Sequence, residues 1–202
     1  MVELDVRRTR DNALVIHHDA SISDLGAIVE LWRDSLPAWV PTLEQAIEAC
    51  AGMIVNIEVK SSPFDPDFDE NRWVAGAVAE TVGERDWADR VLVSSFDLVS
   101  VDRVRDVDEA IPTALLTLPG IDNHAAAAMA WDHGHRVLHP HDLAVTPGLV
   151  EHLHAEGMTV NVWTVDDPDR MRTLVDMAVD GICTNVPDVL VAVLAQDRSR
   201  RA

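Results

Sequence analysis

Two short segments of the chain carry charged side chains at alternate positions. Glu3 and Asp5 lie two apart in "VELDV", and Glu58 and Lys60 lie two apart in "VNIEVK". Alternate residues of a β-strand point to the same side, so each pair faces one side of its strand. Three carboxylates that converge from two neighbouring strands form an oxygen cage suited to a hard divalent cation, Mg²⁺ or Ca²⁺. Lys60 beside this cage would complement an anion such as a phosphate.

Two further side chains extend this candidate site. His18 follows the apolar run "ALVI", and Trp163 ends "VNVW". A histidine at the edge of the cage could transfer protons near neutral pH. Asp19 beside His18 is expected to be a turn or capping residue. Other histidines, such as His133 and His154, are expected on solvated helix faces or turns, whereas His139 and His141 stand at a strand end and remain candidates.

Each candidate also has an explanation without chemistry. Glu3 and Asp5 could lie at an ordinary solvated strand end, and Glu58 and Lys60 could form a plain salt bridge. His18 could be a structural or surface histidine, and Trp163 could pack in the core. A charge inside an apolar strand is costly unless it is paired or bound to a metal. Because all these residues fall at the carboxyl ends of predicted strands, we favour a shared functional site.

The elements that position these residues alternate between apolar runs and amphipathic segments. The expected strands are residues 2–6, 53–60, 90–96, 112–118, 136–141, 158–165 and 180–185. The expected helices are residues 41–52, 69–85, 97–107, 123–134, 146–157, 166–179 and 186–199, with Thr42 and Asp97 as caps. Residues 13–19 are expected to extend the first strand.

This alternation predicts the α/β class, with a parallel sheet covered by helices. The chain has seven strand–helix units where a complete barrel has eight, so we expect a TIM-type (β/α)8 barrel that lacks its first β/α unit. A length of 202 residues suits one core. We therefore expect a single barrel domain over residues 1–195 and a polar tail over residues 196–202.

Composition limits the partners and the location. Asp plus Glu is 35 and Lys plus Arg is 16, which gives a formal net charge of -19. Such an acidic surface repels nucleic acid and anionic membranes. No apolar stretch approaches the roughly 20 residues of a membrane span, and no signal peptide is evident. We expect a cytoplasmic protein in which Cys50 and Cys183 are free thiols.

An ordered set of motifs resembles the glycerophosphodiester phosphodiesterase family over residues 2 to about 190. The motifs are "VELDVRRTRDNALVIHHD", "PTLEQAI", "VNIEVK", "VLVSSFD", "VNVWTVDDPD" and "DGICTNVPD". The resemblance implies a (β/α) barrel that uses a divalent cation. It also implies an enzyme that hydrolyses a small-molecule glycerophosphodiester to glycerol 3-phosphate and an alcohol.

The resemblance assigns roles by motif. It implies that Glu3, Asp5 and Glu58 are metal ligands and that Lys60 contacts the phosphate or another part of the substrate. It implies that His18 is one of two acid/base histidines. It also implies that Trp163 packs against the glycerol part of the substrate. Whether His18 acts as acid or base is left open. The segment between His18 and Pro41 corresponds to an insertion of variable size in the family, and its shortness predicts a small lid.

One family motif is missing from the sequence. The family opens with a strand that ends in His-Arg-Gly and supplies the other catalytic histidine and a phosphate-binding arginine, and no His-Arg-Gly occurs in this chain. Met1 would then fall within the second strand of the family fold. We expect a truncated form of the enzyme with impaired activity.

Two other functions remain open at this point. The chain could be a catalytically inactive remnant that binds a metal, a phosphate or a partner protein, and the exposed strand edges of an open barrel could pair in a homodimer. It could also be another barrel enzyme that acts on sugar phosphates, although the His-Asp pair and "VWTVD" argue against this.

Overall fold

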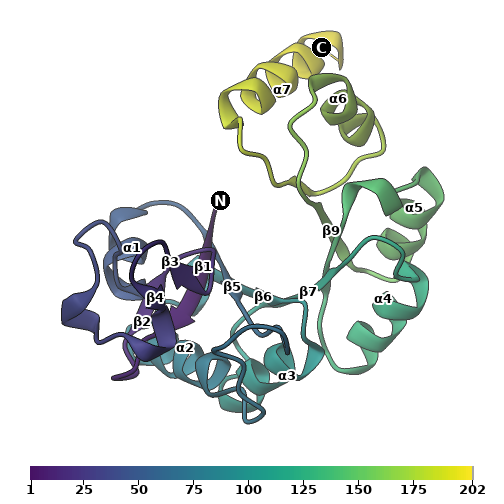
Figure 1. The fold of residues 1–202 in the computed structure, drawn as a ribbon. Coiled ribbons are helices and arrows are strands. Elements are labelled where there is room, and N and C mark those ends of the chain that lie inside the picture. Colours follow the sequence, from purple (N-terminus) through teal and green to yellow (C-terminus); the bar gives the residue numbers. More distant parts are fainter. Residues whose placement is uncertain (202) are drawn as a thin grey trace. The chain divides into compact units, whose positions relative to one another are not determined.

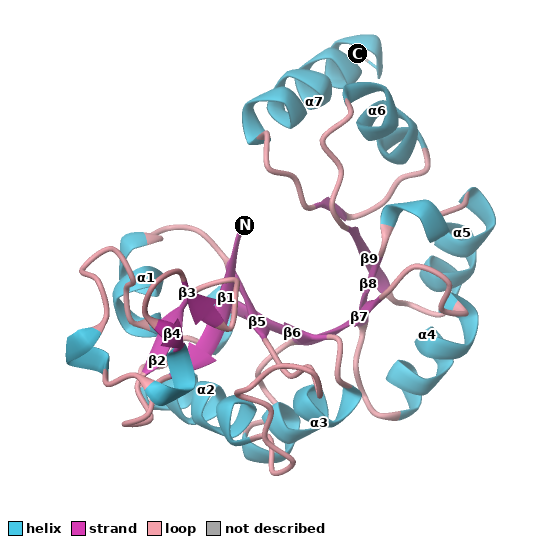
Figure 2. Ribbon diagram, in the orientation of Figure 1, coloured by secondary structure: helices cyan, strands magenta, loops and turns pink. Residues whose placement is uncertain are grey.

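The computed structural model describes the backbone of residues 1–201 and the side chains of residues 1–198. The chain alternates strands and helices along most of its length (Figures 1 and 2). It divides into two compact units, Met1–Leu115 and Leu116–Ala202.

The strands of the first unit form one sheet in the order β2-β1-β5-β6-β7. Their bounds are β1 Val2–Arg8, β2 Leu14–Ile16, β5 Val55–Val59, β6 Val91–Ser95 and β7 Thr113–Thr117, the last of which crosses the boundary between the units. β1, β5, β6 and β7 are parallel, as predicted, whereas β2 is antiparallel to β1.

The helices of the first unit are α1 Leu43–Ala49, α2 Trp73–Glu84 and α3 Leu98–Val107. Three short 3-10 helices lie at η1 Ile28–Glu30, η2 Arg33–Ser35 and η3 Ala88–Arg90, and a small hairpin is formed by β3 Ser21–Ile22 and β4 Gly26–Ala27. The predicted caps are confirmed: Thr42 forms a capping box with Gln45 at α1, and the Asp97 carboxylate accepts from the Ser100 amide at α3.

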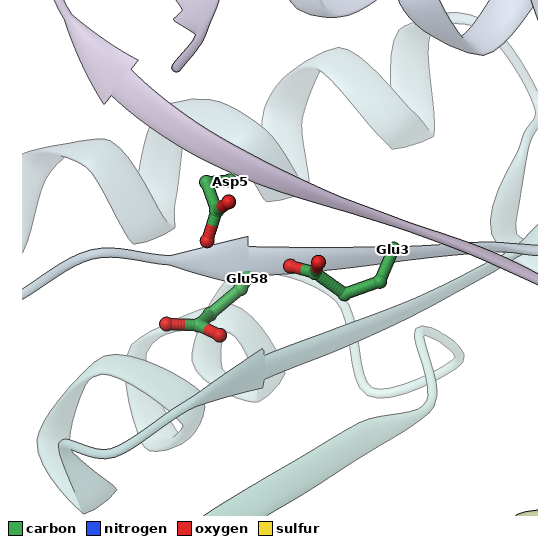
Figure 3. A group of neighbouring side chains, drawn as sticks. All are labelled: Glu3, Asp5 and Glu58. Carbon is green, nitrogen blue, oxygen red and sulfur yellow. The ribbon is translucent and has the colours of Figure 1, made fainter. Parts of the chain in front are cut away.

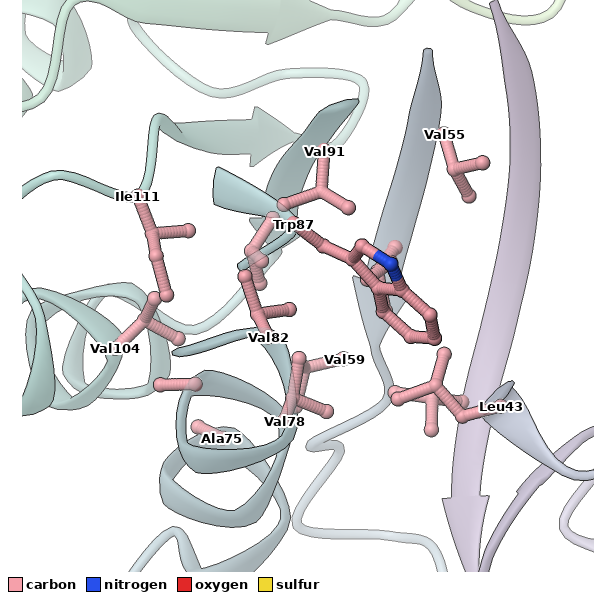
Figure 4. Packing of buried hydrophobic residues seen from close by; sticks show 14 of the residues in the cluster. Leu43, Val55, Val59, Ala75, Val78, Val82, Trp87, Val91, Val104 and Ile111 are labelled. Carbon is pink, nitrogen blue, oxygen red and sulfur yellow. The ribbon is translucent and has the colours of Figure 1, made fainter. Parts of the chain in front are cut away.

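One apolar core lies between these helices and the sheet (Figure 4). From β5 it includes Val55, Ile57 and Val59, which alternate with Asn56 and Glu58. Alternate residues of a strand point to opposite sides, so the same packing that buries the three apolar residues turns Asn56 and Glu58 to the other face of the sheet.

The second unit repeats the strand–helix pattern. Its strands β8 Val137–Pro140, β9 Thr159–Val162 and β10 Gly181–Ile182 pair in parallel in that order. Its helices are α4 Asn123–Asp132, α5 Pro147–Ala155, α6 Pro168–Asp176 and α7 Pro187–Arg201, with a short 3-10 helix η4 at Asp142–Ala144. α7 includes most of the segment that the sequence set apart as a polar tail.

The segment after β1 differs from its prediction. Instead of extending β1, the chain turns back and forms β2, with Val6 opposite Ile16 and Arg8 opposite Leu14. Asn12 has φ of 63°, and the Thr9 hydroxyl accepts from the Ala13 amide, so these residues close the turn. The prediction treated one apolar run as a continuation of another and missed the turn residues between them.

The prediction of solvated histidines was wrong for His135. Its side chain is fully buried, and it lies just beyond Gly134 in the turn that follows α4, where its amide donates to the Ala130 carbonyl. His139, which the sequence kept as a candidate, is also buried.

Among the described helices, none combines the length and apolar character needed to cross a membrane.

Candidate active site

Three carboxylates converge on one face of the first unit, as the spacing predicts. Glu3 and Asp5 come from β1, and Glu58 comes from β5, where it pairs in register with Asp5. Each residue offers a carboxylate oxygen that lies within 4.8 Å of those of the other two. Figure 3 shows the three side chains pointing toward one another. Two adjacent parallel strands therefore build this cluster.

Lys60 supplies a positive charge at this cluster. It directly follows β5, and its Nζ lies 2.7 Å from Asp5 Oδ1 and 2.6 Å from Glu58 Oε1. Burial by itself lowers the pKa of Lys60, but the charge of Glu58 and hydrogen bonds to both carboxylates outweigh burial and raise this pKa. The ammonium therefore stays protonated between the two acids.

Lys60 supplies too little positive charge to keep all three carboxyl groups ionised near pH 7. Burial raises the pKa of Glu3 to about 8, and the charges of Asp5 and Glu58 add to this rise. Burial also raises the pKa of Glu58, against the opposing effect of Lys60. Carboxylates held close together in this way are stabilised by a bound cation, which supplies the missing positive charge.

Two neutral polar atoms support the fit of a cation. Asn56 Oδ1 and Ser94 Oγ are buried and have no hydrogen-bond partner. Asn56 pairs in register with Glu3, and Ser94 pairs with Glu58, so both lie on the face of the carboxylates. The donor set is all oxygen, which is the chemistry of Mg²⁺ and Ca²⁺ sites, and waters of a hydrated cation would satisfy such orphaned atoms.

His18 lies at the end of the segment that follows β2. Its side chain is 75% exposed, and its Nδ1 lies 2.8 Å from Asp19 Oδ1. This hydrogen bond is the main reason that the pKa of Asp19 is lowered. His18 is near enough to the cluster for its charge to act, as one of the smaller influences, on the pKa of Glu58. Asp19 lies in a bend of the chain, which agrees with its predicted place in a turn, and its carboxylate also contacts the His18 ring.

The neighbouring His17 has different contacts. Its amide donates to the Asp5 carbonyl at 2.9 Å, its Nδ1 lies 2.8 Å from the Asp19 carbonyl, and its ring tilts against Trp39 with 5.9 Å between ring centroids. His17 is thus held by backbone contacts on two sides. Of these two neighbouring histidines, His18 is the one whose ring contacts a carboxylate.

Trp163 belongs to the second unit, where it directly follows β9. Its indole Nε1 donates to the His139 carbonyl at 2.8 Å, and its ring meets His141 edge-on at 4.9 Å. Asn161 Nδ2 lies 2.9 Å from His139 Nε2. Burial lowers the pKa of His139 to about 4, so this imidazole is neutral near pH 7. Asn161 was not among the predicted site residues, although its spacing of two from Trp163 places both on one face of the strand.

Comparison with known proteins identifies the family. Residues 26–189 match the model of the glycerophosphoryl diester phosphodiesterase family. The chain is 35% identical to "Probable glycerophosphodiester phosphodiesterase 2" of Mycobacterium tuberculosis, in an alignment that covers 96% of this chain and 78% of that protein.

Solved structures give the fold. A glycerophosphodiester phosphodiesterase from Parabacteroides distasonis is 27% identical with a TM-score of 0.80, over 96% of this chain and 84% of that one. A phosphodiesterase from Oleispira antarctica, solved with the product sn-glycerol-3-phosphate, is 20% identical with a TM-score of 0.83 over the same shares of the two chains. These likenesses confirm the predicted α/β fold of the TIM-barrel type. Its sequence, its fold and its relatives show that the chain belongs to the glycerophosphoryl diester phosphodiesterase family of enzymes.

Proposed function

We propose that this chain hydrolyses glycerophosphodiesters to glycerol 3-phosphate and an alcohol, and that the reaction depends on Mg²⁺ or Ca²⁺. The observation that carries the proposal is the convergence of Glu3, Asp5 and Glu58 beside Lys60, in a chain of this family. The product bound to the Oleispira antarctica relative supports glycerol 3-phosphate as the part of the substrate that the site retains.

The three carboxylates would hold the cation. A divalent cation in such a site stabilises the charge that develops on phosphodiester oxygens during an in-line displacement. Lys60 would add a second positive charge, because its ammonium already lies among these carboxylates and can turn toward a phosphate oxygen. All four side chains are placed by β1 and β5, so the substrate phosphate is expected to bind at the carboxyl end of these two strands.

His18 would transfer the proton. Asp19 holds Nδ1 of the ring at 2.8 Å, which leaves Nε2 to face the reacting group. The same ring could take a proton from the attacking hydroxyl or water, or give one to the leaving alcohol. We assign Trp163 the separate task of packing against the glycerol part of the substrate.

We further propose that the 202-residue chain is slow. It has no His-Arg-Gly sequence, so His18 is the single acid/base histidine that can be assigned by motif. Loss of one acid/base group typically lowers the rate by about 10²–10⁴-fold.

The test is the release of glycerol 3-phosphate from glycerophosphocholine and glycerophosphoethanolamine. We expect release with Mg²⁺ or Ca²⁺, none with excess EDTA, and recovery when the cation is restored. Glu58→Gln should abolish this release, because it removes the buried central carboxylate, whereas Glu80→Gln on the exposed face of α2 should not change it. Hydrolysis that persists in EDTA or in Glu58→Gln contradicts the proposed site.

A further inference from the structure

Arg7 is a buried side chain that joins several parts of the candidate site. It lies on β1, two residues beyond Asp5, and is 4% exposed. Its Nε and Nη2 both donate to the backbone carbonyl of His18, at 3.0 and 2.8 Å. Arg7 was not among the predicted site residues, because its partners lie far from it along the chain.

The other side of the same guanidinium binds two carboxylates. Nη1 donates to both carboxylate oxygens of Asp67 at 2.9 Å, and Asp65 Oδ2 lies 3.1 Å from both Nη1 and Nη2. Asp67 is buried, so its charge and that of Arg7 neutralise each other away from water. Both aspartates lie in the segment that follows β5 and Lys60. Arg7 therefore ties this segment to the backbone of His18.

His18 needs this support because little else holds it. Its ring is largely exposed, and its carboxylate partner Asp19 is equally exposed, so packing does not fix the side chain. The position of the ring therefore depends on the backbone from which it extends. An acid/base group must be held close to its reacting atom, since a displacement of about 1 Å can cost as much as 10²-fold in rate.

We propose that Arg7 is a positioning residue for His18 and that Asp65 and Asp67 orient its guanidinium. The proposal rests on the proposed function in one respect, that His18 transfers the proton. The planar guanidinium of arginine makes both sets of contacts possible, because one edge donates to the His18 carbonyl while the other donates to two carboxylates. A lysine keeps the charge but cannot make both sets of contacts.

The first test compares Arg7→Lys with Arg8→Lys. Arg8 is the adjacent residue of β1, and its guanidinium lies over the Trp73 ring rather than on His18. We expect Arg7→Lys to lower kcat by about 10- to 100-fold, with KM and the Mg²⁺ affinity within about twofold of wild type. Arg8→Lys should leave all three close to wild type. A loss confined to KM or to Mg²⁺ affinity contradicts a role through His18.

The second test combines the substitution with loss of the histidine. If Arg7 acts through His18, adding Arg7→Lys to His18→Ala should change kcat by less than about twofold. A full additional loss in the double variant overturns the proposal. Asp65→Asn is a milder variant that keeps the Asp67 pair, and it should lower kcat less than Arg7→Lys does and have no further effect in His18→Ala.

The third measurement does not depend on turnover. Amide exchange of residues 17–19, followed by NMR, should be faster in Arg7→Lys and Asp65→Asn than in wild type, and unchanged in Arg8→Lys. If wild type itself hydrolyses no glycerophosphodiester, the proposed function fails, and this exchange still decides whether Arg7 holds His18. Unchanged exchange in folded Arg7→Lys or Asp65→Asn overturns the proposal.

Discussion

At the scale of the residue, the candidate site gathers three carboxyl groups around one ammonium group. Lys60 pairs with Asp5 and Glu58, and burial together with the charges of Asp5 and Glu58 raises the pKa of Glu3 to about 8. Carboxyl groups with perturbed pKa values gather at functional sites. This supports the proposal that Glu3, Asp5 and Glu58, of which only Glu58 is buried, hold a cation.

The two adjacent histidines should differ in their effect on catalysis. We predict that His18→Ala lowers kcat by about 10² or more, because it removes the proton-transfer group. His17→Ala should lower kcat by less than about tenfold, since the amide contact to Asp5 survives the substitution. The measurement is kcat for both variants under saturating Mg²⁺, with intact folding checked by circular dichroism. A larger loss in His17→Ala would mean that the wrong histidine has been assigned.

Some of the site residues could be predicted from the sequence, and others could not. Glu3, Asp5, Glu58 and Lys60 were visible because alternation on a strand is a local property. The partners of Arg7 were hidden, because Asp65 and Asp67 lie 58 and 60 positions away and only the loop after β5 brings them near. Contacts of this kind depend on the fold and leave no local pattern.

At the scale of the element, short polar contacts fix where helices begin. Asp97 is the N-cap of α3, but it also accepts from the Ser100 hydroxyl at 2.7 Å and pairs with Arg72 Nε at 2.6 Å. Although burial opposes the shift, these hydrogen bonds lower the pKa of Asp97. One side chain thus joins α3 to the segment that precedes α2.

Loss of the Asp97 side chain should therefore destabilise the protein more than loss of an ordinary helix cap. We predict that Asp97→Ala lowers the free energy of unfolding by about 2–4 kcal/mol, because it removes a cap and leaves Arg72 without its carboxylate. Thr42→Ala, which removes the capping box of α1, should cost about 1 kcal/mol. Urea unfolding of both variants gives the comparison. Equal costs would show that the Arg72 pair adds nothing to the cap.

The elements were predicted well where periodicity was long and poorly where a turn was short. β5 and β6 are short, fully buried strands rich in Val, Leu and Ile that lie between helices in the sequence, which is typical of parallel sheets. β2 was missed as a separate strand because it has three residues and the turn that reverses the chain before it was not recognised. The hairpin of β3 and β4 has two residues in each strand, too few to produce a pattern.

At the scale of the whole molecule, the acidic composition and the fold act on different properties. The net charge of -19 disfavours nucleic acid and anionic surfaces, and it says nothing about the reaction. The alternation of strands and helices gave the fold class. The division into two compact units was not visible, because no linker or change of composition marks residues 115 and 116.

The acid stability of the protein should depend on His139. Burial lowers its pKa to about 4, below the ordinary value of 6.5, so between these pH values the unfolded chain binds a proton that the folded chain does not. Stability from this group is complete above pH 6.5 and is lost as the pH falls toward 4. We predict a loss of about 3 kcal/mol across that window.

Thermal unfolding between pH 4 and 8 tests this dependence. His139→Gln should be less stable than wild type at pH 8 and should lose less stability on acidification, because glutamine does not titrate. His124→Gln, at an exposed histidine of α4, is the matched control and should keep the wild-type slope. Identical slopes in wild type and His139→Gln would show that His139 is not the group responsible.

Calorimetric titration of the folded protein with Mg²⁺ and with Ca²⁺ tests the proposed metal site directly. Wild type should bind one cation, Glu58→Gln should bind neither ion measurably, and Glu80→Gln should bind as wild type does. Glu58→Gln that stays folded and keeps wild-type affinity for the cation would contradict the assignment of Glu3, Asp5 and Glu58 as the metal site.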